Sequence, residues 1–336
     1  MKTVVVVTTG GTIASTANSR GVKVASVSGA DLLAGTRVPD TVALRLVDIA
    51  SVNSFAMDFG DMDRIHDAIR AALDEPDTCG VVVTHGTDTL EETAMLVDVF
   101  HCDPRPVVFT GAQRSADDPD TDGPRNFHDA VLVAASDAAR DHGVLISFDG
   151  TVHAARGTRK VHTNAPAAFS DPDHGPVGTV DGEVAFRSRR RRRPRRRPAA
   201  IGGIRVDTIA FYPGADRIAM DACVAAGAHG LVLEGTGYGN ANADIVAAVD
   251  EHTASGIPVV LSSRVHAGAV RAVYGGGGGG VDLVDAGAIL AGHLRPGQAR
   301  VLLAASIAAG ADRTAVAHAF ATPTHSIDLL TANPGK

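Results

Sequence analysis

The sequence contains no tryptophan, three tyrosines and three cysteines among its 336 residues. Cys79, Cys102 and Cys223 are an odd number with no CxxC spacing, so neither a disulfide framework nor a zinc site is indicated. We expect all three to be buried apolar side chains. The 14 histidines form no HExxH pairing, and we therefore expect no metal and no other cofactor.

Long apolar runs are also missing. No run approaches the roughly 20 residues that a membrane helix needs, and we expect no membrane association. The opening MKTVVVV resembles the start of a signal peptide, but its apolar part is only four valines, so we interpret it as a first strand. We therefore expect a cytoplasmic protein. The composition, 45% hydrophobic and 21% charged, is that of a soluble globular chain long enough for two domains.

Basic residues are unevenly distributed along the chain. The segment RSRRRRRPRRR, residues 187–197, holds nine of the 31 basic residues and no acidic one. A nucleic-acid-binding surface would spread its basic residues over a folded face with aromatic residues among them, and this segment has no aromatic residue. We expect a solvated flexible linker, with contact to nucleic acid or to an acidic partner as the less favoured alternative.

Short apolar runs alternate with longer amphipathic segments, which predicts parallel sheets flanked by helices. The predicted strands are 4–7, 81–83, 107–109, 144–148, 231–233 and 258–261. The predicted helices are 61–73, 90–100, 126–141, 216–226, 242–255 and 296–309. The predicted fold class is α/β, with a larger N-terminal α/β domain (1–186), an Arg/Pro-rich linker (187–203) and a smaller C-terminal α/β domain (204–336).

Polar residues follow the first predicted strand in the loop Thr8-Thr9-Gly10-Gly11-Thr12. The loop matches neither GxGxxG nor the lysine-containing phosphate loop, so nucleotide binding is a distant interpretation. Adjacent glycines allow a tight turn whose N–H groups could hold a carboxylate or an oxyanion. Thr12 is either a functional hydroxyl or simply a helix cap.

The loop after the strand 81–83 reads THGTDTLEETA. Asp88 or Thr89 could cap the following helix, with Glu92 completing a capping box. A helix N-cap needs only one polar side chain, however, and five polar side chains follow the end of this strand. Because ligands of α/β sheets bind beyond the carboxyl ends of the strands, a site is the alternative interpretation.

Lysine is scarce: there are four, against 27 arginines. Arginine keeps its proton, whereas a desolvated lysine can release one. Lys160, in GTRKVHTN, is therefore a candidate base, and an ordinary surface lysine is the alternative.

The segments TTGGTIAS, VVVTHGTDTLEETA, TRKVHTNAPAAF and RPGQARVLLAASIA resemble bacterial L-asparaginases of the threonine-nucleophile type, in order and over nearly the whole chain. The resemblance implies a two-domain α/β protein with active sites between paired subunits, assembled as a homo-oligomer (dimer or tetramer). It also implies cofactor-free hydrolysis of L-asparagine, possibly of L-glutamine too, to the acid and ammonia.

The same resemblance assigns catalytic roles. Thr12 is the first candidate nucleophile, and Thr87, Asp88 and Lys160 form a triad in which neutral Lys160 takes a proton from Thr87. Asp88 would orient Lys160 and pair with the α-ammonium group of the substrate. Backbone N–H groups near Gly11, Thr12 and Gly86 are candidate oxyanion donors. The order in which the threonines attack stays open.

Substrate-binding residues implied by the resemblance are Gly11, Ser54, Phe55, Thr87, Asp88 and Asn240. Ser54 matches the serine that holds the substrate α-carboxylate, and Asn240 an asparagine that reaches the site of the neighbouring subunit.

Three departures from the family pattern stand out. The loop 15–28 has no tyrosine, Phe55 replaces a polar residue, and Gly275 stands where a neighbour-subunit glutamate is expected, at the head of a glycine run, 275–280, that we expect to be flexible. These departures leave the substrate preference and the efficiency open.

Two alternatives within the same fold remain. One is a glutamine-using subunit of a tRNA-dependent amidotransferase. The other is a catalytically weak amino-acid sensor, against which two hydroxyls and a base argue.

Overall fold

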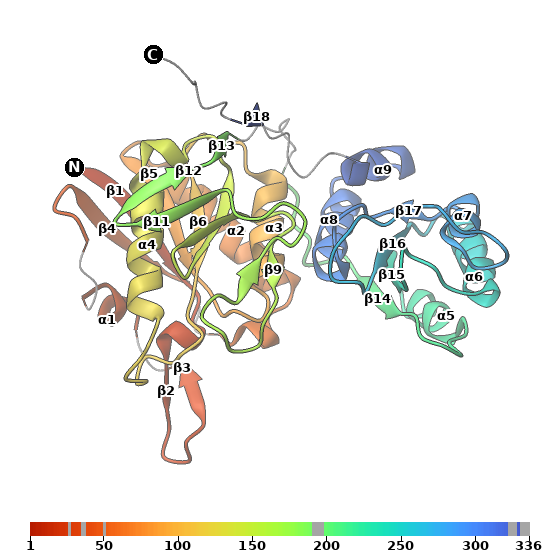
Figure 1. The fold of residues 1–336 in the computed structure, drawn as a ribbon, viewed down its shortest axis with the longest axis horizontal. Helices are drawn as coiled ribbons and strands as arrows, with labels where there is room; N and C mark the ends of the chain where they lie inside the picture. The colour runs from red at the N-terminus through yellow and green to blue at the C-terminus, as the bar shows by residue number, and fades with distance from the viewer. Residues whose placement is uncertain (26–27, 35–37, 50–51, 190–197, 322–327, 330–336) are drawn as a thin grey trace. The chain divides into compact units, whose positions relative to one another are not determined.

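The computed structural model describes residues 1–25, 28–34, 38–49, 52–189, 198–321 and 328–329. The described residues form two compact units, 1–189 with 328–329, and 198–321 (Figure 1). Each unit is a sheet covered by helices, which confirms the predicted two-domain α/β class. Among these residues, no helix is both long enough and apolar enough to cross a bilayer.

An eight-stranded sheet forms the first unit, in the order β12-β11-β8-β7-β6-β5-β1-β4. Its parallel strands are β1 (Lys2–Thr8), β4 (Val42–Asp48), β5 (Thr78–Thr84), β6 (Val107–Thr110) and β7 (Val144–Phe148). Antiparallel strands β8 (Thr151–Ala154), β11 (Gly178–Asp181) and β12 (Glu183–Phe186) complete it. The sheet is therefore mostly parallel, as predicted.

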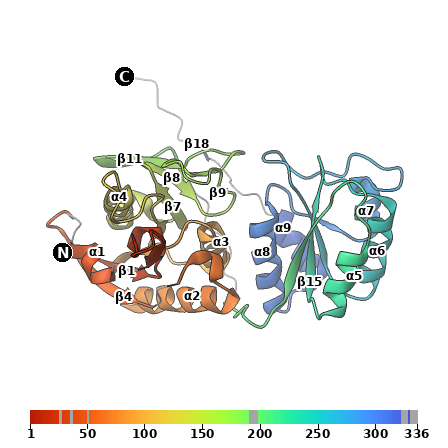
Figure 2. The same ribbon diagram turned by 90° about the horizontal axis from the view of Figure 1, so that it is seen from below.

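Both faces of this sheet are buried, which is why its central strands are runs of valine. Val4 and Val6 pack on one face in a cluster with α4 (Gly123–Ala135). Val5 and Val7 pack on the other face with α2 (Phe59–Asp74) and α3 (Leu90–Phe100). Figure 2 shows these helices on the two sides of the sheet. Burying each valine contributes roughly 1.5 kcal/mol or more to folding.

The second unit has a four-stranded parallel sheet, in the order β14-β15-β16-β17. Its strands are β14 (Val206–Ala210), β15 (Gly230–Gly235), β16 (Val259–Ser263) and β17 (Ile289–Leu290). Its helices are α5 (Ile218–Ala225), α6 (Ala243–Ala254), α7 (Gly280–Asp285), α8 (Pro296–Ala308) and α9 (Arg313–Ala321). Leu231, Leu233 and Leu261 form the core with Ile245 and Val249 of α6.

The remaining described elements are short. They are α1 (Gly29–Ala34), β2 (Ser15–Ala17), β3 (Lys23–Ala25), β9 (Arg159–Lys160), β10 (Phe169–Ser170), β13 (Ser188–Arg189), β18 (Asp328–Leu329) and three 3₁₀ turns (Thr12–Ala14, Ser54–Ala56 and Asp137–Ala139).

All six predicted strands are present, and α3 has the predicted bounds. The helix predicted over 126–141 is wrong at both ends. Residue 124 is a proline, which suits a first helical turn, so α4 begins at Gly123. It ends at Ala135, because Ser136 is extended and its hydroxyl accepts the N–H of Ala138 to begin a separate 3₁₀ turn. The antiparallel strands β8, β11 and β12 were not predicted, since each has only four residues with polar residues among them.

The predicted linker 187–203 lies partly inside the two units. Arg187 donates its N–H to the carbonyl of Val177 (2.9 Å), and β13 pairs with β18 in the first unit. Ile201 is fully buried in the second unit. Residues 190–197, which carry most of the arginine run, lie outside the described residues, as do residues 26–27 of the predicted loop 15–28.

The expectation of a flexible glycine run at 275–280 is not met. The N–H groups of Gly277, Gly278 and Gly279 donate to the carboxylate of Asp282 (2.8–2.9 Å), and α7 begins at Gly280. These backbone donors hold the pKa of Asp282 below its usual value. The run is therefore shaped by a carboxylate near a helix N-terminus, an arrangement that the sequence pattern did not reveal.

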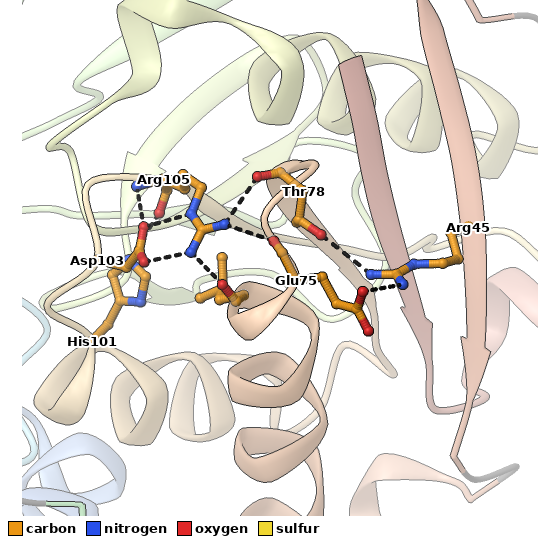
Figure 3. A network of polar contacts seen from close by, with 7 residues as sticks. Arg45, Glu75, Thr78, His101, Asp103 and Arg105 are labelled. Atoms are coloured by element: carbon orange, nitrogen blue, oxygen red, sulfur yellow. Dashed lines mark hydrogen bonds and ion pairs between the residues drawn. The ribbon is translucent and has the colours of Figure 1, made fainter. Parts of the chain in front are cut away.

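Arg105 closes the C-terminal end of α2 (Figure 3). Its guanidinium donates to the carbonyls of Leu73, Glu75 (3.2 Å) and Thr78 (3.1 Å). It also pairs with Asp103 (2.7 Å), which holds the pKa of that carboxyl below its usual value. The last carbonyls of a helix have no partner within the helix, so Arg105 stabilises this end of α2 and the start of β5.

Candidate active site

The candidate site lies at the carboxyl ends of the central parallel strands. Thr8 at the end of β1 is in register with Thr84 at the end of β5, and Thr84 with Thr110 at the end of β6. The two loops singled out in the sequence therefore leave the sheet side by side.

Glycine allows these loops to touch backbone to backbone. Gly11 has φ +91° and ψ −176°, and a Cβ placed there would lie 2.6 Å from Cα and N of Gly86. A Cβ on Gly86 would in turn lie 2.6 Å from Oγ of Ser54. The TTGGT loop, the THGTDT loop and the turn at Ser54 are thus packed too closely for any side chain at either glycine.

Thr8 and Thr9 support the loop. Thr8 Oγ1 donates to Asp48 (2.9 Å), and Thr9 Oγ1 donates to the carbonyl of Thr84 (3.0 Å). Thr12 differs from both. It begins a 3₁₀ turn and is half-buried, and neither its hydroxyl nor its N–H is bonded to any other residue in the described part of the chain. Its hydroxyl is free to meet a ligand.

Lys160 joins the second loop from β9. Its Nζ lies 2.9 Å from Oγ1 of Thr87 and 2.8 Å from Oδ1 of Asp88. Thr87 is buried and the Lys160 side chain is 17% exposed, whereas the Asp88 side chain is 53% exposed. One amine therefore contacts a buried hydroxyl and a carboxylate that remains open to solvent.

The helix-cap interpretation of this loop holds for the position of Thr89 but not for its side chain. Thr89 is the N-cap of α3 but makes no side-chain capping bond. Its hydroxyl instead donates to the carbonyl of Ser54 (2.9 Å), and the N–H of Asp88 donates to Oγ of Ser54 (3.2 Å). The polar side chains of the loop therefore contact Ser54 and Lys160 instead of capping α3.

His85 lies beneath this loop, fully buried. Its Nδ1 lies 2.8 Å from the carbonyl of Gly86, and its Nε2 lies 2.9 Å from the hydroxyl of Thr93. A carbonyl only accepts, so Nδ1 carries the proton and Nε2 accepts from Thr93. Burial lowers the pKa of His85 to about 4, and the ring is therefore neutral at neutral pH.

Glu91, in the first turn of α3, was not singled out in the sequence. Its carboxyl accepts the backbone N–H of Lys160. Although part of the residue remains exposed, burial of the carboxyl raises its pKa to about 8. Two glutamates at a helix start predict only a cap, so nothing in the pattern indicated this contact.

Phe55 follows Ser54 and is 72% exposed, whereas Ser54 is buried.

The β2–β3 hairpin that follows Thr12 is bonded to Asp117. The carboxylate of Asp117 accepts hydrogen bonds from Lys23 Nζ (2.7 Å) and from the N–H of Ala17 (2.9 Å), both in this hairpin.

Asn240 belongs to the second unit. There its Oδ1 accepts the N–H of Gly280 (3.1 Å), which links the turn at 236–240 to the glycine run.

Among the described residues, no cluster of three or more His, Cys, Asp or Glu side chains could hold a metal ion. The site instead offers hydroxyls, one amine, one carboxylate and backbone N–H groups. Such a set can carry out nucleophilic attack on a carbonyl carbon with general-base assistance.

Comparisons with known proteins agree with this chemistry. The chain is 39% identical to a probable L-asparaginase of Deinococcus radiodurans over 248 residues, which covers 71% of this chain and 74% of that protein. It is 33% identical to a glutamyl-tRNA(Gln) amidotransferase subunit of Halobacterium salinarum, covering 90% of this chain and 74% of that protein.

A solved structure, a probable cytoplasmic L-asparaginase from Campylobacter jejuni, matches with a TM-score of 0.82 at 30% identity, covering 95% of this chain and 99% of that one. Residues 3–192 match the family described as "Asparaginase, N-terminal", and residues 205–320 match "Glutaminase/Asparaginase C-terminal domain". The chain belongs to the asparaginase family.

Proposed function

We propose that this protein is an amidohydrolase that converts L-asparagine to L-aspartate and ammonia. The observation that carries the proposal is the contact of Lys160 Nζ with both Thr87 and Asp88, beside the loop that presents Thr12. The names of the relatives above, most of them L-asparaginases, support asparagine as the substrate.

In the first half of the reaction, Thr12 Oγ1 attacks the side-chain amide carbon of the substrate. The N–H groups of Gly11 and Thr12, neither of which has an acceptor among the described residues, stabilise the oxyanion. The C–N bond then breaks, ammonia leaves with the proton released by the hydroxyl, and an acyl ester on Thr12 remains. Water hydrolyses the ester and regenerates the hydroxyl.

Lys160 acts as the base of the triad. As a neutral amine it accepts the proton of the Thr87 hydroxyl, 2.9 Å away, so that Thr87 can take a proton from Thr12 in the first half and from the attacking water in the second. The proton is then delivered to the departing ammonia in the first half and to the Thr12 oxygen in the second. Asp88 orients the amine, and its exposed oxygen binds the substrate α-ammonium group. Ser54, whose Oγ accepts from Asp88 N–H and can still donate its own proton, binds the α-carboxylate.

Ammonia release tests this assignment. We expect turnover of L-asparagine by the native protein and losses of about 100-fold or more in Thr12→Ala, Thr87→Ala and Lys160→Met, with Lys23→Met as the matched control. An enzyme that binds asparagine but releases no ammonia between pH 6 and 10 would contradict the proposal. Assays with L-glutamine, D-asparagine and D-glutamine define the substrate preference, which the departures from the family pattern at Phe55 and Gly275 leave open.

A second candidate is the glutaminase subunit of a tRNA-dependent amidotransferase, supported by the Halobacterium salinarum relative. It predicts glutamine as the preferred substrate and tRNA binding that weakens as salt rises. Salt-independent ammonia release from asparagine with no tRNA binding supports the asparaginase.

The family resemblance also supports a homo-oligomer, a dimer or a tetramer, in which Asn240 reaches the site of a neighbouring subunit. Light scattering on the purified protein measures the subunit number. A cytoplasmic location is supported by the similarity to the Campylobacter jejuni protein, which is described as a probable cytoplasmic L-asparaginase. We further propose that residues 1–186 and 204–336 are separate domains joined through the arginine run, and limited proteolysis within that run would test this division.

A further inference from the structure

We infer that Asp117 is a positioning residue for Thr12: its carboxylate ties strand β2, which follows Thr12 closely in the chain, to the loop that connects β6 with α4. This loop, residues 111–122, is called the β6 loop below. The inference rests on the proposed function, in which the Thr12 hydroxyl attacks the substrate.

The chain is fixed just before Thr12. Gly11 packs against the backbone of Gly86 so closely that no Cβ fits between them. The carbonyl of Gly11 also accepts the N–H of Ala14 (3.0 Å) and the hydroxyl of Ser15 (2.8 Å). These bonds close the 3₁₀ turn that Thr12 begins, so the orientation of Thr12 depends on where the chain is held after the turn.

The β6 loop holds the chain just after this turn. The N–H of Ala116 donates to the carbonyl of Ser15 (3.0 Å), and the N–H of Ala17 donates to Oδ2 of Asp117 (2.9 Å). Ser15 and Ala17 are the two ends of β2, which pairs with β3 in a separate two-stranded sheet. Because this hairpin projects from the first unit (Figure 1), the bonds at its base join it to the rest of the unit.

The β6 loop is itself well bonded. The carboxylate of Asp122 accepts the N–H groups of Gln113 (3.0 Å) and Arg114 (2.9 Å). The side-chain amide of Asn126, in α4, donates to the carbonyl of Gly111 (3.0 Å). The turn 12–14 therefore lies between two anchored segments of the chain, and a change at either one is transmitted to the Thr12 hydroxyl.

The Asp117 carboxylate is oriented for its bond to β2. Ser115, which is buried, donates its hydroxyl to Oδ1 (2.7 Å), and Lys23 Nζ on β3 contacts the same oxygen (2.7 Å). The lysine and aspartate side chains are 49% and 34% exposed, and an ion pair this exposed contributes little. We therefore assign the positioning to the bond with the Ala17 backbone.

Asp117 acts in one protonation state. Lys23, Ser115 and the N–H of Ala17 hold the pKa of Asp117 below its usual value, so the carboxylate stays ionised from pH 6 to 10. The effect of Asp117 on Thr12 is thus independent of pH, whereas a group that exchanged protons with the substrate would change the pH profile.

Two substitutions separate the bond from the charge. Asp117→Asn keeps an oxygen that accepts the N–H of Ala17 but loses the charge, whereas Asp117→Ala loses both. Asp118→Ala is the matched control, because it removes the same charge from the next residue, whose carboxylate accepts the N–H of Asp120 within the β6 loop (3.0 Å). Thermal unfolding of each variant establishes that it is folded.

The first readout is ammonia release from L-asparagine between pH 6 and 10. We expect kcat of Asp117→Ala to fall by roughly tenfold, by the same factor at every pH, because a misplaced nucleophile reacts more slowly. KM should change by less than about threefold, since Ser54 and Asp88 keep their positions. Asp117→Asn should stay within about threefold of the native kcat, and Asp118→Ala should equal it. An equal loss in Asp117→Asn, or a loss that varies with pH, would overturn the inference.

The second readout does not depend on activity. Amide hydrogen exchange, measured by mass spectrometry on peptides from residues 9–25, reports how firmly this segment is held. We expect faster exchange there in Asp117→Ala alone, with exchange in α2 unchanged in every variant. Unchanged exchange in 9–25, or faster exchange with a native kcat, would contradict the inference. If exchange responds as expected but the native protein releases no ammonia, the tie between Asp117 and β2 is supported and the proposed hydrolase function fails.

Discussion

Substituting alanine for Gly11 tests whether the close contact of the two loops builds the site. The backbone conformation of Gly11, φ +91° and ψ −176°, is one that essentially only glycine adopts, and a side chain there costs roughly 1–3 kcal/mol. The new Cβ would also lie 2.6 Å from the Gly86 backbone. To reach an ordinary contact of 3.4 Å, the loops must separate by about 0.8 Å.

Because a displacement of about 1 Å at reacting groups can cost about 100-fold in rate, we expect kcat/KM of Gly11→Ala to fall by roughly that factor. The assay is ammonia release from L-asparagine, together with the thermal unfolding midpoint. Gly182→Ala is the control, since Gly182 has φ +68° and nothing within 4 Å of a Cβ. It should lose some stability but keep its activity. Equal activity of the two variants would refute the role of the loop contact.

Three further predictions concern stability and specificity. Arg105→Ala should lower the free energy of unfolding in urea by about 2 kcal/mol or more, because three carbonyls lose their donor. Arg45→Ala loses a more exposed 3.4 Å ion pair with Glu75 and one hydrogen bond to Thr78 (3.2 Å), and should cost only about 1 kcal/mol. His85 takes up a proton near pH 6.5 in the unfolded chain but only near pH 4 in the folded protein. The free energy of unfolding should therefore fall by up to about 3 kcal/mol as the pH drops through this range, and this fall should be smaller in His85→Gln. Phe55→Gln should lower KM for asparagine by about two- to tenfold through one added hydrogen bond. Its thermal stability should be unchanged, because Phe55 is exposed. An unchanged KM would show that Phe55 does not contact the substrate.

Much of the fold could be predicted from the sequence because hydrophobic periodicity is local. The strand β1 is a run of valines, and a strand with both faces buried needs no alternation. The edge strand β4, VALRLVD, was missed although Val42, Leu44 and Leu46 do alternate along it. The bounds of α4 were wrong because Pro124 and Ser136 set them locally, within a longer helical pattern.

The candidate site was predicted in part. The motifs identified Thr12, Thr87, Asp88 and Lys160 as candidates, and the structure brings Lys160 within hydrogen-bond distance of Thr87 and Asp88. Their catalytic roles stay predictions until variants are assayed. Glu91 and His85 could not be assigned from the pattern, because a buried carboxyl and a buried imidazole differ from exposed ones only through distant partners.

The sequence by itself determined the α/β class, the buried valine strands and the residue types available for chemistry, because these depend on local composition and spacing. Only the tertiary structure decided that Lys160, 73 positions after Thr87, lies 2.9 Å from its hydroxyl. It also decided that the backbone of Gly11 meets that of Gly86, and that the carboxyl of Glu91 is buried. Contacts and desolvation of this kind arise from residues distant in the chain, and no local pattern encodes them.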